Sequence, residues 1–321
     1  MSKNVPDPPH PTRRRQRLPG ETGAEVARVR EEAEQIEAIL QSNSYIPAIM
    51  DTSFLGGNDA RSVRLQLDYL KPELLMREHG VEYTIVVFGG TRIPEPARCA
   101  AETKALEEEL GVSPNDRQLA RRLELARRVQ SKSRYYDVAR EFSHLVARAG
   151  EGPGDSRLVV VTGGGPGIME AANRGAAEAD AKSIGLNITL PREQFPNAWV
   201  TPELCFQFNY FALRKLHFML RARALVAFPG GYGTLDELFE TLTLIQTRKI
   251  KPLPVVLVGE SFWRRAVDFD FLVEEGVIDP EDRELFWFAE TAQDIWAGLQ
   301  HWYERAGDTL LPKAAAADDR A

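Results

Sequence analysis

The sequence predicts an α/β protein with a Rossmann-like, doubly wound parallel sheet and an N-terminal helical extension. Three observations lead to this fold class. Short, nearly continuous apolar runs such as residues 84–88 (TIVVF) are typical of strands buried on both faces of a parallel sheet. These runs alternate with longer stretches of helical periodicity, which favours strand–helix–strand units. Several of the runs end in a glycine-rich loop, the position at which open α/β sheets bind ligands.

The predicted elements alternate along the whole body of the chain. Strands are expected at residues 84–88, 157–162, 183–190, 225–228 and 254–259, with a further apolar stretch at 204–208. Helices are expected within the charged region 94–149, after the second loop through Ala181, at 210–223, from Thr234 onward, at 262–274 and at 291–305. We interpret the pair Tyr135 and Tyr136 as packing residues.

The ends of the chain differ in composition from this body. Residues 1–23 are rich in proline and charge, include an Arg13-Arg14-Arg15 run and predict a disordered arm. Residues 24–80 form the predicted helical extension, with helices at 24–40 and 60–78 and an interruption expected at Pro72. The predicted Rossmann-like domain spans residues 81–307, and residues 308–321 are predicted to be a disordered tail.

Composition restricts the possible partners and compartment. The chain has 321 residues, and 40 basic against 47 acidic residues give a formal charge of −7, which offers no general attraction to nucleic acid or to anionic membranes. Cys99 and Cys205 are far apart and match no metal-ligand spacing, so no disulfide framework and no metal site are predicted. No signal peptide or membrane-spanning run is recognised, and we expect a cytoplasmic protein.

The stretch around which the other elements are arranged is residues 224–240, ALVAFPGGYGTLDELFE. Here a short apolar strand passes through Gly230, Gly231 and Gly233 into a helix predicted to begin at Thr234. Backbone N–H groups at a helix start lack intrahelical partners and bind anions when glycines expose them, so a phosphate is the expected ligand. The alternative is a capping box, because Thr234 and Glu237 have the spacing T-x-x-E.

The loops exclude two common nucleotide chemistries. Residues 163–167 (GGGPG) lack the G-x-G-x-x-G pattern of dinucleotide sites, and no loop places a lysine as a P-loop requires. A nucleoside monophosphate fits better, with its phosphate on Gly231, Gly233 and Thr234. Glu237 would then face the ribose, where a carboxylate can stabilise an oxocarbenium-like sugar and orient a water, while Arg214 binds phosphate or steadies the departing base. For each charged residue, a structural ion pair is the alternative.

Residues 229–237 (PGGYGTLDE) resemble the P-G-G-x-G-T-x-x-E motif of the Lonely Guy (LOG) family, whose members were long labelled lysine decarboxylases. Every fixed position matches, and residues 163–176 (GGGPGIMEAANRGA) and the Arg214-Lys215 pair are also similar to that family. The resemblance covers roughly residues 83–305, and the first 80 residues resemble those of the longer members. The first loop, Gly89-Gly90-Thr91-Arg92, stands where the short members carry a Gly-Ser type turn, which leaves base preference open.

The resemblance implies a homo-oligomer that hydrolyses nucleoside 5′-monophosphates, AMP or cytokinin ribotides, to free base and ribose 5-phosphate without a metal or organic cofactor. It implies Arg214 and Glu237 as the catalytic pair. The remaining implied substrate-binding residues come from the three loops and the Arg-Lys pair, and are Gly89, Gly90, Gly165, Met169, Glu170, Lys215, Gly230, Gly231, Gly233 and Thr234.

Three other functions remain open at this point. A nucleotide-binding or regulatory module would keep the pocket without turnover. Amino-acid decarboxylation would need a lysine for pyridoxal phosphate, and no lysine stands in a context that singles it out. The third is binding of DNA by the basic arm, and the acidic balance of the chain counts against it.

Overall fold

The computed structural model describes residues 32–152, 154–189 and 195–312. Its centre is one parallel sheet in the order β4-β3-β2-β1-β5-β6-β7. The strands are Tyr83–Phe88 (β1), Leu158–Thr162 (β2), Ser183–Ile188 (β3), Cys205–Phe208 (β4), Ala222–Ala227 (β5), Val255–Val258 (β6) and Phe286–Ala289 (β7). The predicted doubly wound parallel α/β fold is confirmed.

The strand order determines where a ligand can bind. From β1 the chain builds outward through β2, β3 and β4, and then returns to the other side of β1 with β5. The order therefore reverses between β1 and β5, and the crevice outside the carboxyl ends of the strands at such a reversal is the usual ligand site of open α/β sheets. The loops after β1 and β5 are the two glycine loops that flank this point.

Helices cover both faces of the sheet. One face packs against Arg134–Ala147 (α7), Ile168–Glu178 (α8) and Ala292–Arg305 (α13). The other packs against Arg61–Glu78 (α4), Phe211–Leu220 (α9), Tyr232–Gln246 (α10), Glu260–Ala266 (α11) and Phe269–Glu274 (α12). Strand residues such as Ile85 and Val86 are fully buried on opposite faces, which is why the strands read as unbroken apolar runs. Tyr135 and Tyr136 are buried in the core, as expected.

Some element predictions are wrong in detail. Pro72 lies inside a continuous α4 and does not interrupt it. The single helix expected at 262–274 is two helices, because Val267 is extended and the Asp268 side chain caps α12 by accepting from Phe271 N at 3.0 Å. Strand β7, at the edge of the sheet, was not predicted.

The predicted tail begins too early at residue 308. Leu310 is buried, and the Arg223 guanidinium donates to the backbone oxygens of Thr309 and Leu310. Pro312 accepts a hydrogen bond from Arg157 at 2.8 Å. Residues 308–312 therefore pack on the domain, and residues 313–321 lie outside the described residues.

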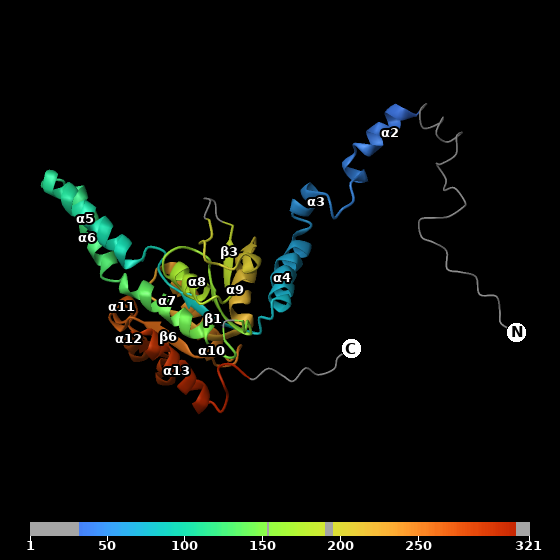
Figure 1. Cartoon of the computed structure of the whole chain (residues 1–321). Coiled ribbons are helices and arrows are strands. Elements are labelled where there is room, and N and C mark those ends of the chain that lie inside the picture. The colour runs from blue at the N-terminus through green and yellow to red at the C-terminus, as the bar shows by residue number, and fades with distance from the viewer. Residues whose placement is uncertain (1–31, 153, 190–194, 313–321) are drawn as a thin grey trace. The chain divides into compact units, whose positions relative to one another are not determined.

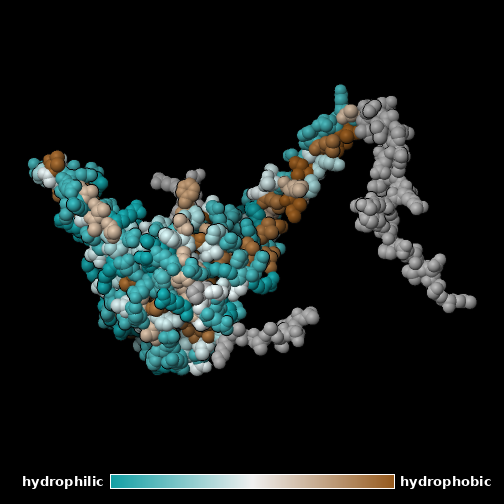
Figure 2. Space-filling view, viewed as in Figure 1, coloured by the Kyte–Doolittle hydropathy of each residue, from teal (hydrophilic) through white to brown (hydrophobic). Residues whose placement is uncertain are grey.

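Of the described residues, 32–64 form a unit separate from the compact unit that begins at Leu65. In the separate unit, the described elements before α4 are Ala33–Leu40 (α2), a 3₁₀ turn at Asn43–Tyr45 and Thr52–Gly56 (α3). Large apolar side chains such as Ile49 and Phe54 are exposed there, and Figure 2 shows apolar residues gathered along this segment. The predicted arm at 1–23 and the first turns of the helix predicted at 24–40 lie outside the described residues.

Between β1 and α7 the chain forms a helical hairpin, Pro96–Val112 (α5) and Arg117–Gln130 (α6), which Figure 1 shows extending away from the sheet. Asp116 starts the second helix by accepting from the N–H groups of Gln118 and Leu119. The two helices share a small core of their own around Leu106, Leu119 and Leu123. The sequence indicates helix throughout 94–149 but not the division into three helices.

Gly175 in α8 is required by the close packing of α8 on α7. A Cβ added there would lie 2.0 Å from the Arg140 carbonyl oxygen, and backbone cannot move aside cheaply. We expect Gly175→Ala to lower the free energy of unfolding by at least about 2 kcal/mol in urea denaturation. The matched control is Gly111→Ala in α5, where no atom lies within 4 Å. That control should be neutral or stabilising by up to about 1 kcal/mol, and equal stabilities for the two variants would contradict the packing argument.

Candidate functional site

The three glycine loops meet at the carboxyl edge of the sheet. Gly90 N donates to Pro229 O at 2.8 Å and so joins the first loop to the third. Gly90 O accepts from Ile168 N at 3.3 Å and joins the first loop to the second. Gly167, with φ +74°, allows this approach, since a Cβ on it would lie 2.4 Å from Gly90 O. The residues predicted from the three loops therefore lie in one region.

The third loop ends in an open helix terminus. Helix α10 begins at Tyr232 with Gly231 as its N-cap, and no side chain caps it. Within the described part of the chain, the N–H groups of Gly231, Tyr232 and Gly233 donate no hydrogen bond. A Cβ on Gly231 or Gly233 would have no atom within 4 Å, so no protein atom crowds the side-chain side of these two residues. Such a terminus can bind an anion.

The capping-box interpretation of Thr234 and Glu237 is wrong. The helix starts two residues before Thr234, whose N–H donates to Gly231 O at 3.0 Å, and Glu237 lies one turn further along the helix. The Thr234 side chain instead lies against Gly230, because a Cβ added to Gly230 would be 2.1 Å from Thr234 Oγ1. Gly230 thus lets the hydroxyl of Thr234 lie directly at the loop.

Arg214 in α9 extends across the sheet edge to the second loop. Its Nε donates to Leu186 O at the end of β3 at 2.7 Å, and the guanidinium lies 5.2 Å from the centre of the Phe218 ring. A Cβ on Gly163 would lie 2.7 Å from Arg214 Nη2 and 3.0 Å from Met169 Sδ. Arg214, Met169 and the second loop are therefore adjacent. Burial lowers the pKa of Arg214, and the neighbouring Glu237 opposes this effect.

Glu237 is a buried carboxyl with an elevated pKa. Its side chain comes from the second turn of α10, and the residue is only 3% exposed. Burial raises its pKa to about 7, against the attraction of Lys215 and Arg214. In the described residues it forms no ion pair, and with this pKa its protonated and ionised forms are both populated near neutral pH. A carboxyl of this kind is suited to proton transfer.

Lys215, the other cation predicted from α9, has two partners on α10. Its Nζ lies 2.9 Å from Asp236 Oδ1 and 3.0 Å from Glu240 Oε2. Burial lowers the pKa of Lys215, but the contacts with the two carboxylates outweigh burial, and the pKa is raised. The ammonium is thus bound to protein carboxylates on either side of Glu237 in the sequence.

The second loop is held by asparagines that sequence reasoning missed. Asn197 N donates to Gly164 O at 2.8 Å, and its Nδ2 donates to Gly165 O and to Asn173 Oδ1 at 3.0 Å each. Asn173, fully buried in α8, also accepts from Thr162 Oγ1 at 2.8 Å. The contact that Gly165 makes here is therefore through its backbone oxygen, which accepts from Asn197. The N-A-W turn at 197–199 is the only signal in the sequence, since Asn favours such side-chain-to-backbone contacts.

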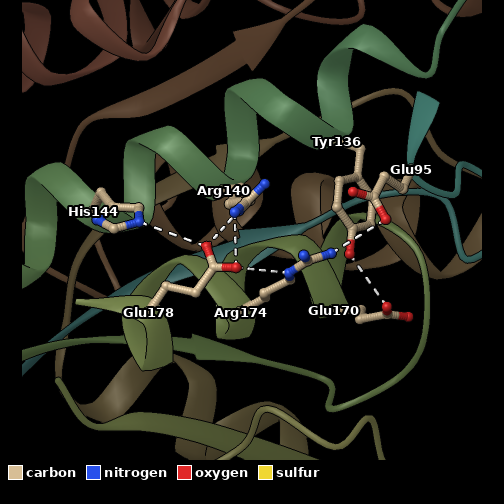
Figure 3. Close-up of polar contacts among 7 residues, drawn as sticks. All are labelled: Glu95, Tyr136, Arg140, His144, Glu170, Arg174 and Glu178. Carbon is tan, nitrogen blue, oxygen red and sulfur yellow. Dashed lines mark hydrogen bonds and ion pairs between the residues drawn. The ribbon is translucent and has the colours of Figure 1, made fainter. Parts of the chain in front are cut away.

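Glu170 lies to one side, in a network shown in Figure 3. Its carboxylate accepts from Tyr136 at 3.2 Å, while Arg174 reaches Glu95 at 3.3 Å and Glu178 at 2.8 Å. Glu170 also lines a cavity of about 550 Å³, which the first and second loops share with the α5–α6 hairpin. In the described residues Glu170 makes no hydrogen bond or ion pair with Arg214 or Glu237, so it lies beside this pair and not within it.

The described residues contain no group of three or more His, Cys, Asp and Glu side chains arranged to hold a metal ion. In the same residues, no helix is long and apolar enough to cross a membrane. Both cysteines, Cys99 and Cys205, are free thiols.

The chain is similar in sequence to known proteins. Residues 169–299 match a family model described as possible lysine decarboxylase. The chain is 31% identical over 189 residues to the cytokinin riboside 5′-monophosphate phosphoribohydrolase LOG3 of Arabidopsis thaliana, covering 56% of this chain and 82% of that protein. It is 29% identical over 182 residues to the probable phosphoribohydrolase LOGL3 of Oryza sativa subsp. japonica, covering 54% and 79%.

A solved structure of a Moco carrier protein from Chlamydomonas reinhardtii is also similar, with 19% identity, coverage of 70% of this chain and 99% of that one, and a TM-score of 0.41. That likeness is too distant to bear on function. The identity to LOG3 over most of its length is sufficient to assign the family. The chain belongs to the LOG family.

Proposed function

We propose that the protein hydrolyses the N-glycosidic bond of nucleoside 5′-monophosphates and releases free base and ribose 5-phosphate. The observation that carries the proposal is the placement of Glu237, a buried carboxyl with a pKa of about 7, one turn beyond the open N-terminus of α10. The N–H groups of 231–233 can hold the 5′-phosphate. The ribose then lies over the first turn of α10, within reach of the carboxyl.

Cleavage follows from the charges in this arrangement. As the bond between C1′ and the base nitrogen breaks, the sugar becomes oxocarbenium-like, and ionised Glu237 stabilises the positive charge while it orients a water. The water oxygen bonds to C1′, its proton passes to the carboxylate, and the base leaves with the electron pair of the broken bond and takes up a proton. Arg214 binds the phosphate or steadies the departing base.

The substrate class is also supported by the relatives, whose names give cytokinin riboside 5′-monophosphates as substrates. AMP carries the same phosphate and ribose and a related base, so we propose both as substrates. The test is a panel of AMP, a cytokinin riboside 5′-monophosphate, other monophosphates and the matching nucleosides. We expect base release from monophosphates and at least about 100-fold lower kcat/KM for nucleosides, because charge-assisted phosphate contacts are lost. Equal rates for nucleosides and monophosphates would contradict the proposed phosphate site.

Two other activities are less well supported. A nucleotide-binding module without turnover would have no use for a carboxyl of raised pKa, and it would be favoured if the protein bound AMP tightly but formed no product over hours. A pyridoxal-phosphate decarboxylase needs a lysine that loses its proton readily. Lys215 lies at the site but is paired with Asp236 and Glu240, which hold it protonated.

Gly233→Ala separates ligand binding from folding. The added Cβ meets no protein atom within 4 Å, and alanine favours the helix by up to about 1 kcal/mol, so the variant should be at least as stable as wild type. If the phosphate lies against the main chain, the methyl group displaces it, and we expect kcat/KM for AMP to fall at least about 10-fold, or ~1.4 kcal/mol. Thermal melts and initial rates measure the two effects. Unchanged kinetics in the stable variant would place the phosphate elsewhere.

We also propose that the protein works as a homo-oligomer in the cytoplasm. Large apolar side chains are exposed on helices next to the site, including Phe211 at 48% and Tyr232 at 92%. Surfaces of this kind mark protein interfaces when they are contiguous. Light scattering after size-exclusion chromatography tests the oligomer, and a mass equal to the 36.0 kDa of one chain would contradict it.

A further inference from the structure

Helices α9 and α10 bring an unequal set of charges together beside the candidate site. Helix α10 contributes three carboxyl groups, Asp236, Glu237 and Glu240, and α9 contributes Arg214 and Lys215. The three carboxyl groups and two cations do not form one-to-one ion pairs. Lys215 Nζ binds Asp236 and Glu240 at 2.9 and 3.0 Å, and neither cation forms an ion pair with Glu237 in the described residues. Lys215 is well enclosed, with 17% of its side chain exposed.

These are also the charged groups that act on Glu237. Lys215 and Arg214 from α9 favour its ionised form, while Glu240 and Asp236 from its own helix oppose it. The other elements packed on α10 present their charges elsewhere. Arg223 of β5 faces Asp308, and Asp282, in the 3₁₀ turn Pro280–Leu285, contacts Gln246 at the far end of α10. The balance at Glu237 therefore depends on the Lys215 cluster and Arg214.

We propose that Lys215 is a positioning residue, whose ammonium binds Asp236 and Glu240 and thereby keeps two neighbouring negative charges from acting on Glu237. This inference rests on the proposed function and deepens it, because it gives Lys215 a role other than the substrate contact predicted from sequence. One ammonium that bridges two carboxylates one turn apart also fixes α9 against the start of α10. Glu237 can then ionise within the working range of the enzyme although it is buried.

The test is the pH dependence of kcat/KM in three variants. Lys215→Met removes one positive charge and leaves the negative charges of Asp236 and Glu240 unpaired. Both changes raise the pKa of Glu237. We therefore expect the acidic limb of the pH profile of kcat/KM to move up by about 1 pH unit. Lys215→Arg keeps both ion pairs and should leave the limb within about 0.3 unit of wild type. The triple variant Lys215→Met, Asp236→Asn, Glu240→Gln also removes the two carboxylates, and the limb should return to or below its wild-type position.

Other roles for Lys215 predict other results. If the lysine only holds the helices together, Lys215→Met and the triple variant lose rate equally at all pH values, and the limb does not move. If it binds the substrate phosphate, KM rises in both variants and the limb again stays in place. Either result overturns the inference, and melting curves of each variant confirm that the fold is retained.

A second measurement needs no substrate. The carboxyl carbon of Glu237, labelled with ¹³C and assigned by its loss in Glu237→Gln, titrates in the NMR spectrum of the full chain. We expect its midpoint to rise in Lys215→Met and to return in the triple variant. A midpoint that does not move overturns the inference. A midpoint that moves in a protein without hydrolytic activity would support the role of Lys215 and refute the proposed function.

Discussion

Glu237→Gln will lower kcat for nucleoside monophosphates by about 1,000-fold while the protein stays folded. The amide keeps the shape and hydrogen-bonding capacity of the side chain but cannot become an anion or accept the proton of the attacking water. Loss of a single preorganised electrostatic group or a general base costs about 10²–10⁴ in rate. Glu274→Gln, an exposed glutamate of α12, is the matched control and should retain wild-type rates. A residual rate above about one tenth of wild type would remove Glu237 from the chemistry.

The same variant should be more stable than wild type at high pH. The pKa of Glu237 is raised from 4.5 to about 7, so the folded state holds its proton more tightly than the unfolded chain does. Between these values the unfolded chain ionises first, and the free energy of unfolding falls as the pH rises. The loss is about 3 kcal/mol when the pH exceeds 7, and it disappears below about pH 4.5.

Glutamine does not ionise, so it avoids this loss. Urea denaturation of wild type and Glu237→Gln at pH 5 and pH 8 measures the effect, and the variant should gain on wild type between the two. A difference that does not change with pH would mean that the carboxyl is not buried as described. A gain in stability with a loss of activity is expected where a site keeps a costly group for its function.

Arg214→Ala is the second large effect, with an expected fall in kcat/KM of about 100- to 1,000-fold. The guanidinium lies beside Gly163 of the second loop, held by Leu186 O, and it favours the ionised form of Glu237. Its removal should therefore also move the acidic limb of kcat/KM upward, since the pKa of Glu237 rises further. Initial rates between pH 5 and pH 9 measure both effects.

Two further variants make this result specific. Arg214→Lys keeps the charge but loses the planar group that donates from Nε to Leu186 O, so we expect a smaller loss, about 10- to 100-fold. Arg264→Ala removes an exposed arginine from an ion pair with Glu260 and should leave activity unchanged. If Arg214→Ala changed neither the rate nor the limb, Arg214 would be only a structural contact of α9.

The strands of this fold are readable from the sequence because burial on both faces leaves few polar positions. The runs that contain Val86, Val160 and Val226 are mostly apolar, and each is a strand. Strand β7 escapes this rule, because it is an edge strand of four residues, FWFA, most of them only half-buried. The expected interruption at Pro72 is wrong for a different reason. Local propensity favours a break, but Pro72 and Met76 are the buried residues of α4, and packing overrides propensity there.

The convergence of the glycine loops could also be predicted, since the carboxyl ends of parallel strands meet at one edge. The side-chain partners could not. Whether Lys215 binds a ligand or the pair Asp236 and Glu240 depends on how α9 is rotated against α10, which no periodicity specifies. The same holds for Asn197, whose contact with Gly165 joins segments 32 residues apart. The burial of Glu237 likewise follows from packing and not from its motif.

The central claim is that Glu237 and Arg214, set at the open end of α10, break the bond between base and sugar. Its most direct test is the quantification of all products from AMP and from a cytokinin riboside 5′-monophosphate, with wild type and Glu237→Gln measured side by side. We predict that wild type releases free base and ribose 5-phosphate in equal amounts, with no inorganic phosphate, and that Glu237→Gln releases almost none. Nucleoside with inorganic phosphate, or no product from any monophosphate, would contradict the account.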